Sequence, residues 1–400
     1  MYKKSEHQFF WSDYILLALL TGLYFSIILA EIALVVYTSI LFFLIFKKEI
    51  NADYFSSLLL AYVLSGLLSM ISGGDSIRDL PRMLPHLMVL IYFPVTYFLK
   101  KENQIDLLRW LRWIFLLATL SAIVGIVYHF LGKERTTTTY GGYYTLANLM
   151  SWSVPVSIAL LIQSKSRPLL IYIAATFVQF IALWWTYTRS AMFAVVGALG
   201  IWFFFWISKN IIHKTFSFRQ ILLGGVIFLS LPVLLVIFTL SSEDPRINPF
   251  AKNQVKDQVN IDFTSGRESI IQDAYRVISK DWQEGQYKKI ILGYGQHSRY
   301  RLVNDEFTSW ESDYLQITMN QGIVGLVIIL LLYLYFLKRI WRGLRSDNNL
   351  LNGLAASGLT IFLMSFFTLK LTGWHSGAMF IIILTFLENQ QLKINQHNKD

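Results

Sequence analysis

Runs of apolar residues, each long enough to cross a bilayer as a helix, follow one another along most of the chain. About 20 apolar residues are needed for such a crossing. Short polar segments rich in lysine and arginine separate many of the runs. The pattern predicts an all-α, polytopic integral membrane protein with about twelve transmembrane helices. The predicted spans are 11–29, 31–46, 54–73, 84–99, 111–131, 145–163, 168–187, 190–208, 221–240, 314–337, 350–371 and 374–389.

Composition agrees with this pattern. The 400 residues are 54% hydrophobic and only 15% charged, whereas soluble domains carry about 25% charged residues. The basic N-terminal head continues directly into a full-length apolar run, so we expect a retained first helix and no cleaved signal peptide. The chain contains no cysteine, which excludes disulfides, thiolate catalysis and thiolate metal sites.

The placement of the basic residues predicts the topology. With the N-terminus in the cytoplasm, 19 of the 35 Lys and Arg residues lie inside, 10 lie in the long segment 241–311, and the remaining six lie elsewhere on the outer side. This is a positive-inside distribution, and it explains most of the net charge of +10 without nucleic acid as a partner. The chain therefore divides into spans one to nine (1–240), one long extracytoplasmic loop (241–311), and spans ten to twelve with a cytoplasmic tail (312–400).

The long outer loop contains an amphipathic helix. In "TSGRESIIQDAYRVISKDW", Ser265 and Glu268 match a capping box, which predicts a helix that begins at Gly266. Arg267 lies in the first turn, where the helix dipole favours a bound anion. The simpler interpretation is a helix that packs on the membrane or on the tops of the spans. Its predicted apolar face consists of Ile270, Ile271, Ala274, Val277 and Ile278.

Arg189, in "WWTYTRSAMF", stands between two predicted spans, where a charge is costly and seldom without function. Other charged residues on the outer side are also unexplained by topology. Guanidinium groups bind phosphate oxygens in a bidentate manner. Several arginines near one or two carboxylates suit a lipid-linked pyrophosphate, because arginine stabilises the leaving diphosphate and a carboxylate takes the proton from an attacking hydroxyl. The unexplained residues are Arg78, Arg82, Arg135, Arg189, Arg267, Arg276, Arg299, Arg301, Glu311 and Asp313.

Three segments resemble the superfamily of O-antigen ligases and O-antigen polymerases. They are "TYTRSAMF", "TSGRESIIQDAYRVISKDW" followed by "ILGYG", and "ESDYLQITMNQGIVGL" with its pair Gly322 and Gly325. The resemblance implies a glycosyltransferase of the bacterial inner membrane that faces the periplasm or cell exterior and uses no metal or cofactor. Its donor and acceptor would be oligosaccharides linked to undecaprenyl pyrophosphate, and a flippase and a chain-length regulator would be candidate partners. Arg189 and Arg267 would contact the diphosphate.

One departure from the ligases bears on the choice of branch. Ligases of the superfamily carry a His-Asn pair where this chain reads Glu311–Ser312, which favours the Wzy-type polymerases and makes Glu311 the candidate base. Glu311 and Asp313 could instead simply favour a helix N-terminus. If both are helical they point about 200° apart, so we expect Asp313 to cap or brace the helix. The remaining candidates for substrate binding are Arg78, Arg82, Arg135, Arg276, Arg299, Asp313, Tyr314 and His375, with His375 of "TGWHSG" also the reserve base.

Three functions therefore compete. The first is an inverting polymerase that moves a growing chain from its carrier onto the terminal sugar of an incoming lipid-linked repeat. The second is a ligase that passes the finished chain to a terminal acceptor. The third is a flippase without enzymatic activity. Transporters place polar residues near the midplane and often show two related halves, whereas the unexplained charges here lie on the outer side.

Overall fold

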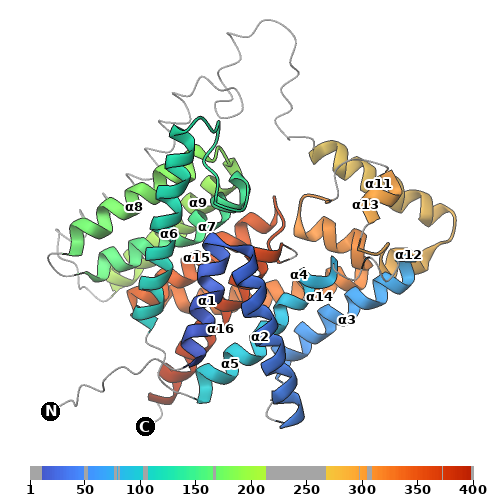
Figure 1. The fold of residues 1–400 in the computed structure, drawn as a ribbon. Helices are drawn as coiled ribbons and strands as arrows, with labels where there is room; N and C mark the ends of the chain where they lie inside the picture. The colour runs from blue at the N-terminus through green and yellow to red at the C-terminus, as the bar shows by residue number, and fades with distance from the viewer. Residues whose placement is uncertain are drawn as a thin grey trace, which may run out of the picture.

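The computed structural model is mainly helical over the residues it describes, with no strand among them. These residues are 11–48, 53–75, 79, 82–101, 107–164, 168–212, 267–296, 298–303, 309–371 and 373–397. In Figure 1 the group of α6, α7, α8 and α9 lies on one side, and α3, α11, α12 and α13 lie on the other. The elements are α1 (Trp11–Phe25), α2 (Ile27–Phe46), α3 (Tyr54–Gly73), α4 (Leu84–Leu87), η2 (Met88–Ile91), α5 (Tyr92–Lys101), α6 (Leu107–Phe130), α7 (Tyr143–Gln163), α8 (Pro168–Trp185), α9 (Arg189–Ile212), α11 (Arg267–Gln283), α12 (Tyr287–Leu292), α13 (Ser298–Val303), α14 (Asp313–Leu344), α15 (Asn349–Ser365) and α16 (Trp374–His397).

The described helices overlap the predicted apolar runs, but some boundaries differ: the break between α1 and α2 lies at Ser26 and not at residue 30, and the predicted span 84–99 is divided into α4, η2 and α5. Only the ninth predicted span, 221–240, lies outside the described residues. Among the described residues, six helices, namely α2, α3, α6, α7, α9 and α14, are long and apolar enough to cross a membrane, while others, such as α15, are apolar but shorter. The boundary of the eleventh span is corrected, because α15 ends at Ser365 and not near residue 371.

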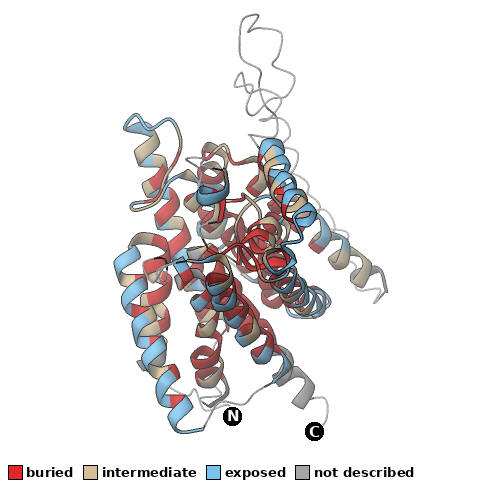
Figure 2. Cartoon of the chain, turned by 90° about the vertical axis from the view of Figure 1, so that its right-hand side faces the viewer, coloured by how far each residue is buried: buried red, intermediate tan, exposed pale blue. Residues whose placement is uncertain are grey.

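Large apolar side chains cover the outward faces of the peripheral helices, as expected for a membrane protein. On α2, Ile28, Val35 and Phe46 are exposed by 66%, 65% and 85%. Figure 2 shows exposed residues along the outer helices and buried ones in the interior.

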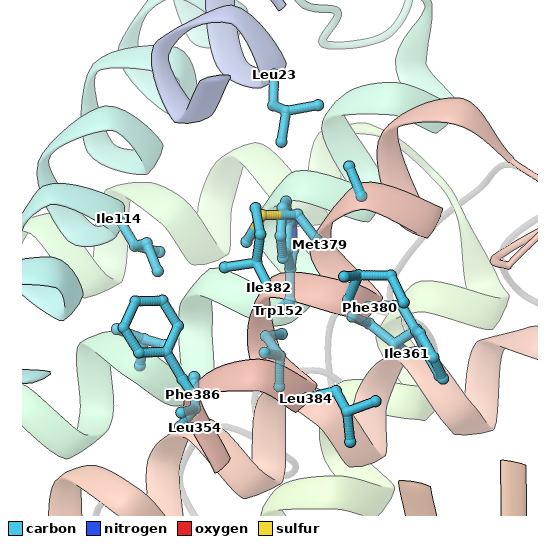
Figure 3. Close-up of a cluster of buried hydrophobic side chains, with 14 of the residues drawn as sticks. Leu23, Ile114, Trp152, Leu354, Ile361, Met379, Phe380, Ile382, Leu384 and Phe386 are labelled. Carbon is cyan, nitrogen blue, oxygen red and sulfur yellow. The ribbon is translucent and has the colours of Figure 1, made fainter. Parts of the chain in front are cut away.

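The centre of the bundle is the contact between α7 and α15. Small residues allow the two backbones to approach closely, as membrane helices commonly do. A Cβ added at Gly353 would lie 2.2 Å from the Cβ of Ala159, and the Ser357 hydroxyl donates to the Trp152 carbonyl at 2.5 Å. Around this contact, buried side chains from α1, α6, α7, α15 and α16 form one apolar cluster (Figure 3).

Helix α15 runs antiparallel to α7, because Gly353 meets Ala159 and the later residue Ser357 meets the earlier residue Trp152. The same holds for α9: Gly197 faces Leu363, and near the other end the Lys209 amine donates to the Ser346 carbonyl at 3.1 Å.

Helix α14 is antiparallel to α15 as well, since Gly343 faces Ala355 while Phe336 and Ile340 face Gly358. Helices α7, α9 and α14 are therefore parallel to one another. Their N-termini all lie at the end of the bundle where α15 finishes.

The turn after α12 is docked against an interruption in α14. Gly322 has φ 68° and ψ −165°, so α14 is two helical pieces joined at a kink. The Tyr294 amide donates to the Met319 carbonyl at 2.9 Å, and the Gly295 amide donates to the Asn320 carbonyl at 3.1 Å. The backbone of the outer loop thus satisfies carbonyl groups that the interruption frees, which lets a broken helix lie within the bundle.

Buried polar side chains fix the same turn to α3 and α4. The His86 ring contacts the Tyr62 hydroxyl at 2.6 Å through Nδ1 and the Gln296 amide oxygen at 2.8 Å through Nε2. Asp75 accepts from the Gln296 backbone amide at 2.7 Å and pairs with Arg301 at 2.7 Å. These contacts hold the C-terminal part of the outer loop in one place on the bundle.

Candidate active site

Arg189 is the first residue of α9, directly after the break that separates α9 from α8. The break is held by a neighbouring loop: the Thr136 amide donates to the Trp185 carbonyl at 3.1 Å, and the Thr136 hydroxyl donates to the Ala182 carbonyl at 2.8 Å. Arg189 is half-buried. A cation at a helix N-terminus adds to the positive end of the helix dipole, and such a position favours an anion.

Arg267 occupies the same position in α11, whose first residue it is. Ile270 and Ala274 are buried and pack with Tyr294, Trp310 and Met319, while Ile271 is 59% exposed. The amphipathic helix thus rests on the loop and on the N-terminal part of α14. The Arg267 side chain is half-buried, and its Nε is a buried atom with no hydrogen-bond partner in the described part of the chain.

Glu311 lies outside the helix, contrary to the case in which it and Asp313 share one. Helix α14 begins at Asp313, and the Ser312 side chain caps it by accepting from the Leu315 amide at 3.2 Å. Glu311 has a left-handed backbone with φ 63°, a conformation that costs a non-glycine residue of order 1–3 kcal/mol and that clusters at functional sites. Its carboxylate is half-buried and accepts from the Ser309 hydroxyl at 3.2 Å.

Tyr144, in the first turn of α7, interacts electrostatically with both Glu311 and Arg267. The negative charge of Glu311 and the positive charge of Arg267 both act on its hydroxyl. The neighbouring Tyr143 ring lies 4.4 Å from the Tyr144 ring, and the Arg135 guanidinium stands 4.2 Å above Tyr143. Arg135 thus lies against Tyr143, and Arg267 and Glu311 lie within electrostatic range of Tyr144.

Asp313 is fully buried and serves as a brace. Its Oδ2 accepts from the Tyr333 hydroxyl at 2.6 Å and from the backbone amides of Lys370 and Leu371 at 2.9 and 2.8 Å. These bonds tie the start of α14 to the connection between α15 and α16. Asp313 therefore fixes the start of α14, and with it the position of Glu311 two residues earlier.

Lys370 is a buried cation that was not among the candidates predicted from the sequence. Its side chain is 1% exposed and its amine donates to the Asn148 amide oxygen. Asn148 lies one helical turn after Tyr144 in α7, on the same face. Burial lowers the pKa of the Lys370 amine to about 7, opposed by the nearby charge of Asp313. Like Arg189, Lys370 is a charge in an apolar stretch, where a charge is costly and seldom without function.

Two of the predicted arginines make hydrogen bonds or ion pairs with other residues of the chain. Arg299 is 2% exposed, donates to the Ser309 carbonyl at 2.5 Å and lies 5.6 Å from the Trp310 ring centroid. Arg301 pairs with Asp75 and donates to the Gly73 carbonyl at 2.7 Å. Both hold the outer loop together in this structure.

The other candidates lie apart or outside the described residues. Arg82 pairs with Asp79 at 2.7 Å, and the exposed Arg276 contacts Asp273 at 3.5 Å. The Tyr314 hydroxyl lies 3.2 Å from that of Ser365 and its ring packs on Tyr333 and Phe366. Arg78 lies outside the described residues; His375 falls in the first turn of α16, but its side chain is not described. No group of three potential metal-ligating side chains occurs among the described residues.

The arrangement suits an anionic ligand beside a proton acceptor. Three parallel helices, α7, α9 and α14, direct their N-termini to one end of the bundle. At these termini stand Tyr144, Arg189 and, two residues before α14, Glu311. Arg267 adds a second guanidinium at this end through its proximity to Tyr144. A phosphate group is stabilised by such termini and by arginine, and a carboxylate there can accept a proton from a hydroxyl.

Comparison with known proteins bears on the part of the chain that carries this site. A search of curated proteins finds no match. Residues 174–330 match a protein-family model described as O-antigen ligase. The match contains Arg189, Arg267 and Glu311, while Arg135, Tyr144 and Lys370 lie outside it. It supports assignment to the O-antigen ligase superfamily, and with it a membrane enzyme of the glycosyltransferase kind that acts on glycans.

Proposed function

We propose that the chain is a polysaccharide polymerase of the bacterial inner membrane. It transfers a growing glycan from undecaprenyl pyrophosphate to the terminal sugar of a lipid-linked repeat unit, on the outer face of the membrane. The observation that carries this proposal is the position of Arg135 against Tyr143, and of Arg267 and Glu311 within electrostatic range of the adjacent Tyr144, at the end where α7, α9 and α14 begin. The anion is the diphosphate of the donor lipid.

The arginines serve the leaving group. Arg267 has a buried Nε without a partner in the described residues, so it can donate to a diphosphate oxygen without losing an existing bond at that atom. Arg189 supplies a second guanidinium beside the N-terminus of α9. As the bond between the anomeric carbon and the pyrophosphate oxygen breaks, the electron pair moves to the diphosphate, and these groups stabilise the developing charge.

Glu311 serves the nucleophile. The hydroxyl of the acceptor sugar attacks the anomeric carbon, a new carbon–oxygen bond forms, and the hydroxyl proton passes to the Glu311 carboxylate. Attack opposite to the leaving diphosphate inverts the configuration. The left-handed backbone of Glu311 and the buried brace at Asp313 keep the carboxylate at the outer end of α14. In this scheme the arginines provide the positive charge that a divalent ion provides in other transferases.

A ligase is the second candidate, because the matching family model carries that description. The two activities use the same donor and differ in the acceptor. The acidic residue at position 311 favours the polymerase, since the ligases that the chain resembles carry a histidine there.

The acceptor decides between them in a purified assay. We expect the full chain in detergent, given a single lipid-linked repeat as both donor and acceptor, to form a ladder of longer lipid-linked glycans. A chelator should leave the rate unchanged. Product formed only after a separate terminal acceptor is added would identify a ligase. Absence of glycan transfer with either acceptor, together with movement of the lipid across vesicles, would favour a flippase and contradict both enzymatic functions.

A further inference from the structure

A second polar site lies at the opposite end of the bundle from the candidate active site. It is a cavity of about 370 Å³ between the start of α3, the end of α5 and the ends of α14 and α16. Arg339 in its wall lies 26 residues after Asp313 in α14, which corresponds to roughly 40 Å of helix. Figure 1 shows α5 and the end of α16 on the side where both chain termini lie. The polar residues in its wall include Asp53, Thr96, Arg339, Thr385, Glu388 and Asn389.

An ion pair forms one wall of this cavity. The Arg339 guanidinium lies 2.9 Å from Glu388 Oε1, the Tyr92 hydroxyl donates to Glu388 Oε2 at 2.7 Å, and the Tyr335 hydroxyl also donates to Glu388. The side chains of Arg339 and Glu388 are only 18% and 10% exposed. Glu388 thus has donors for both oxygens, and its charge is compensated by Arg339.

Two further polar groups at the cavity have no such compensation. The Thr96 hydroxyl and the Asn389 amide nitrogen are buried atoms without a hydrogen-bond partner in the described part of the chain, and the Asn389 residue is 7% exposed. A buried donor left unsatisfied costs roughly 1–3 kcal/mol. Both atoms belong to residues that line the same cavity, so one ligand with acceptor oxygens can satisfy both.

The charges of the described lining residues indicate which charged group the ligand carries. Arg339 neutralises Glu388, which leaves the charge of Asp53 without a cation among the residues that line the cavity. Asp53 caps α3 through Oδ1, and within the described part of the chain its Oδ2 has a single long contact of 3.4 Å, from the Tyr92 hydroxyl. A purely anionic ligand is disfavoured beside this carboxylate. The fitting ligand joins acceptor oxygens to a cationic amine.

We propose that this cavity binds a phosphate ester that carries a primary amine, namely the headgroup of phosphatidylethanolamine in the adjoining leaflet. The phosphate oxygens accept from Thr96 and Asn389, and the ammonium group donates to Asp53. Tyr54 at the rim is 63% exposed, and Phe55 and Leu99 supply apolar wall, as a site open to lipid requires. By the predicted topology this leaflet is the cytoplasmic one. The site is independent of the proposed transfer activity.

The experiment measures bound lipid on the full chain purified in detergent, by native mass spectrometry. Phosphatidylethanolamine, phosphatidylcholine and phosphatidylglycerol are added separately at equal concentration. We expect the highest occupancy for the ethanolamine lipid, because the choline lipid has no N–H donor and the glycerol lipid has no cation. Thr96→Val and Asn389→Leu should each lower that occupancy roughly 2- to 10-fold, the worth of one hydrogen bond.

Thr385→Val is the matched control. Thr385 also lines the cavity, but its hydroxyl already donates to the Ile381 carbonyl at 2.7 Å, so this variant should bind the lipid as the parent does. Displacement by soluble phosphoethanolamine would support the same chemistry with a soluble ligand, and its failure would assign the site to the lipid. Equal occupancy by phosphatidylglycerol, or equal losses in the Thr96 and Thr385 variants, would overturn the proposal.

Discussion

At the scale of single residues, Arg189 and Arg276 form a useful pair for testing the diphosphate hypothesis. Arg189 is half-buried at the start of α9, whereas the Arg276 side chain is 77% exposed. Arg189→Lys keeps the charge but loses the bidentate fork, so we expect transfer to fall by about 10-fold or more at unchanged membrane levels, the worth of one charge-assisted hydrogen bond. Arg276→Lys should have a mild effect. Normal polymer in cells that carry Arg189→Ala would contradict the hypothesis.

Glu311 and Asp313 are expected to differ in the kind of defect that they produce. Glu311→Gln removes the base but keeps the shape, and should slow the chemical step by roughly 10² or more with binding of the lipid diphosphate nearly unchanged. Asp313→Asn disturbs a buried acceptor of three hydrogen bonds and should lower the melting temperature and the yield. Single-turnover rates and thermal melts of the purified variants separate the two. A stable, inactive Asp313→Asn beside an active Glu311→Gln would reverse the roles.

Lys370 predicts a pH dependence of stability. Its pKa in the folded protein is about 7, below the value of about 10.4 for an unfolded lysine. Between these values the unfolded chain binds more protons, so the folded state gains stability as pH rises, by up to about 1.4 kcal/mol per pH unit. Lys370→Met removes this contribution. We therefore expect the melting temperature of the parent, relative to that of Lys370→Met, to rise from pH 7 to pH 9.5. A difference independent of pH would show that Lys370 is not buried in this way.

Residue identity and spacing predicted part of this site but not its assembly. Arg189 and Arg267 both lie at helix N-termini, and the sequence indicated this position for Arg267. The proximity of Arg267 to Tyr144 could not be derived, because it depends on how the helices are arranged in space. Asp313 and Glu311 are two residues apart, but the left-handed backbone of Glu311, which separates their environments, leaves no mark in the sequence. Lys370, a charge inside the predicted span 350–371, carried the same signal as Arg189 in the sequence.

At the scale of elements, the kink of α14 and the turn after α12 depend on each other. Gly322 has a positive φ, and a Cβ there would lie 2.3 Å from the Ile291 carbonyl oxygen. Gly322→Ala should therefore destabilise the protein by about 1–3 kcal/mol from backbone strain alone, and by more from the clash. Gly200→Ala is the control, because nothing lies within 4 Å of a Cβ there and alanine favours a helix by about 0.5–1 kcal/mol. Melts of both variants in detergent test this, and similar melting temperatures would contradict the docking.

Hydrophobic patterning predicted the helices well, because each apolar run must satisfy its own backbone within the membrane. The segment of α3 coincides with its predicted span, 54–73. The pattern could not predict the kink at Gly322. The carbonyl groups freed there are satisfied by Tyr294 and Gly295, which lie some 30 residues earlier and were interpreted only as a turn. The helix is interrupted for a tertiary reason, which local periodicity does not contain.

At the scale of the whole molecule, the two polar sites fit opposite faces of one membrane. The candidate active site lies where α14 begins, and the cavity beside Arg339 lies near where it ends. The charge bias of the short loops places the first outside and the second inside.

The absence of native cysteine allows that orientation to be tested directly by labelling intact cells with a membrane-impermeant maleimide. Tyr275 in α11 is 73% exposed, and the Asp347 side chain, between α14 and α15, is 92% exposed, so cysteines introduced there react wherever reagent is present. We expect Tyr275→Cys to be labelled in intact cells. Asp347→Cys, and a cysteine at Asn398 in the tail, should be labelled only after the membrane is permeabilised. Labelling at 347 and 398 without labelling at 275 would place the candidate active site in the cytoplasm, where transfer to an exported glycan could not occur.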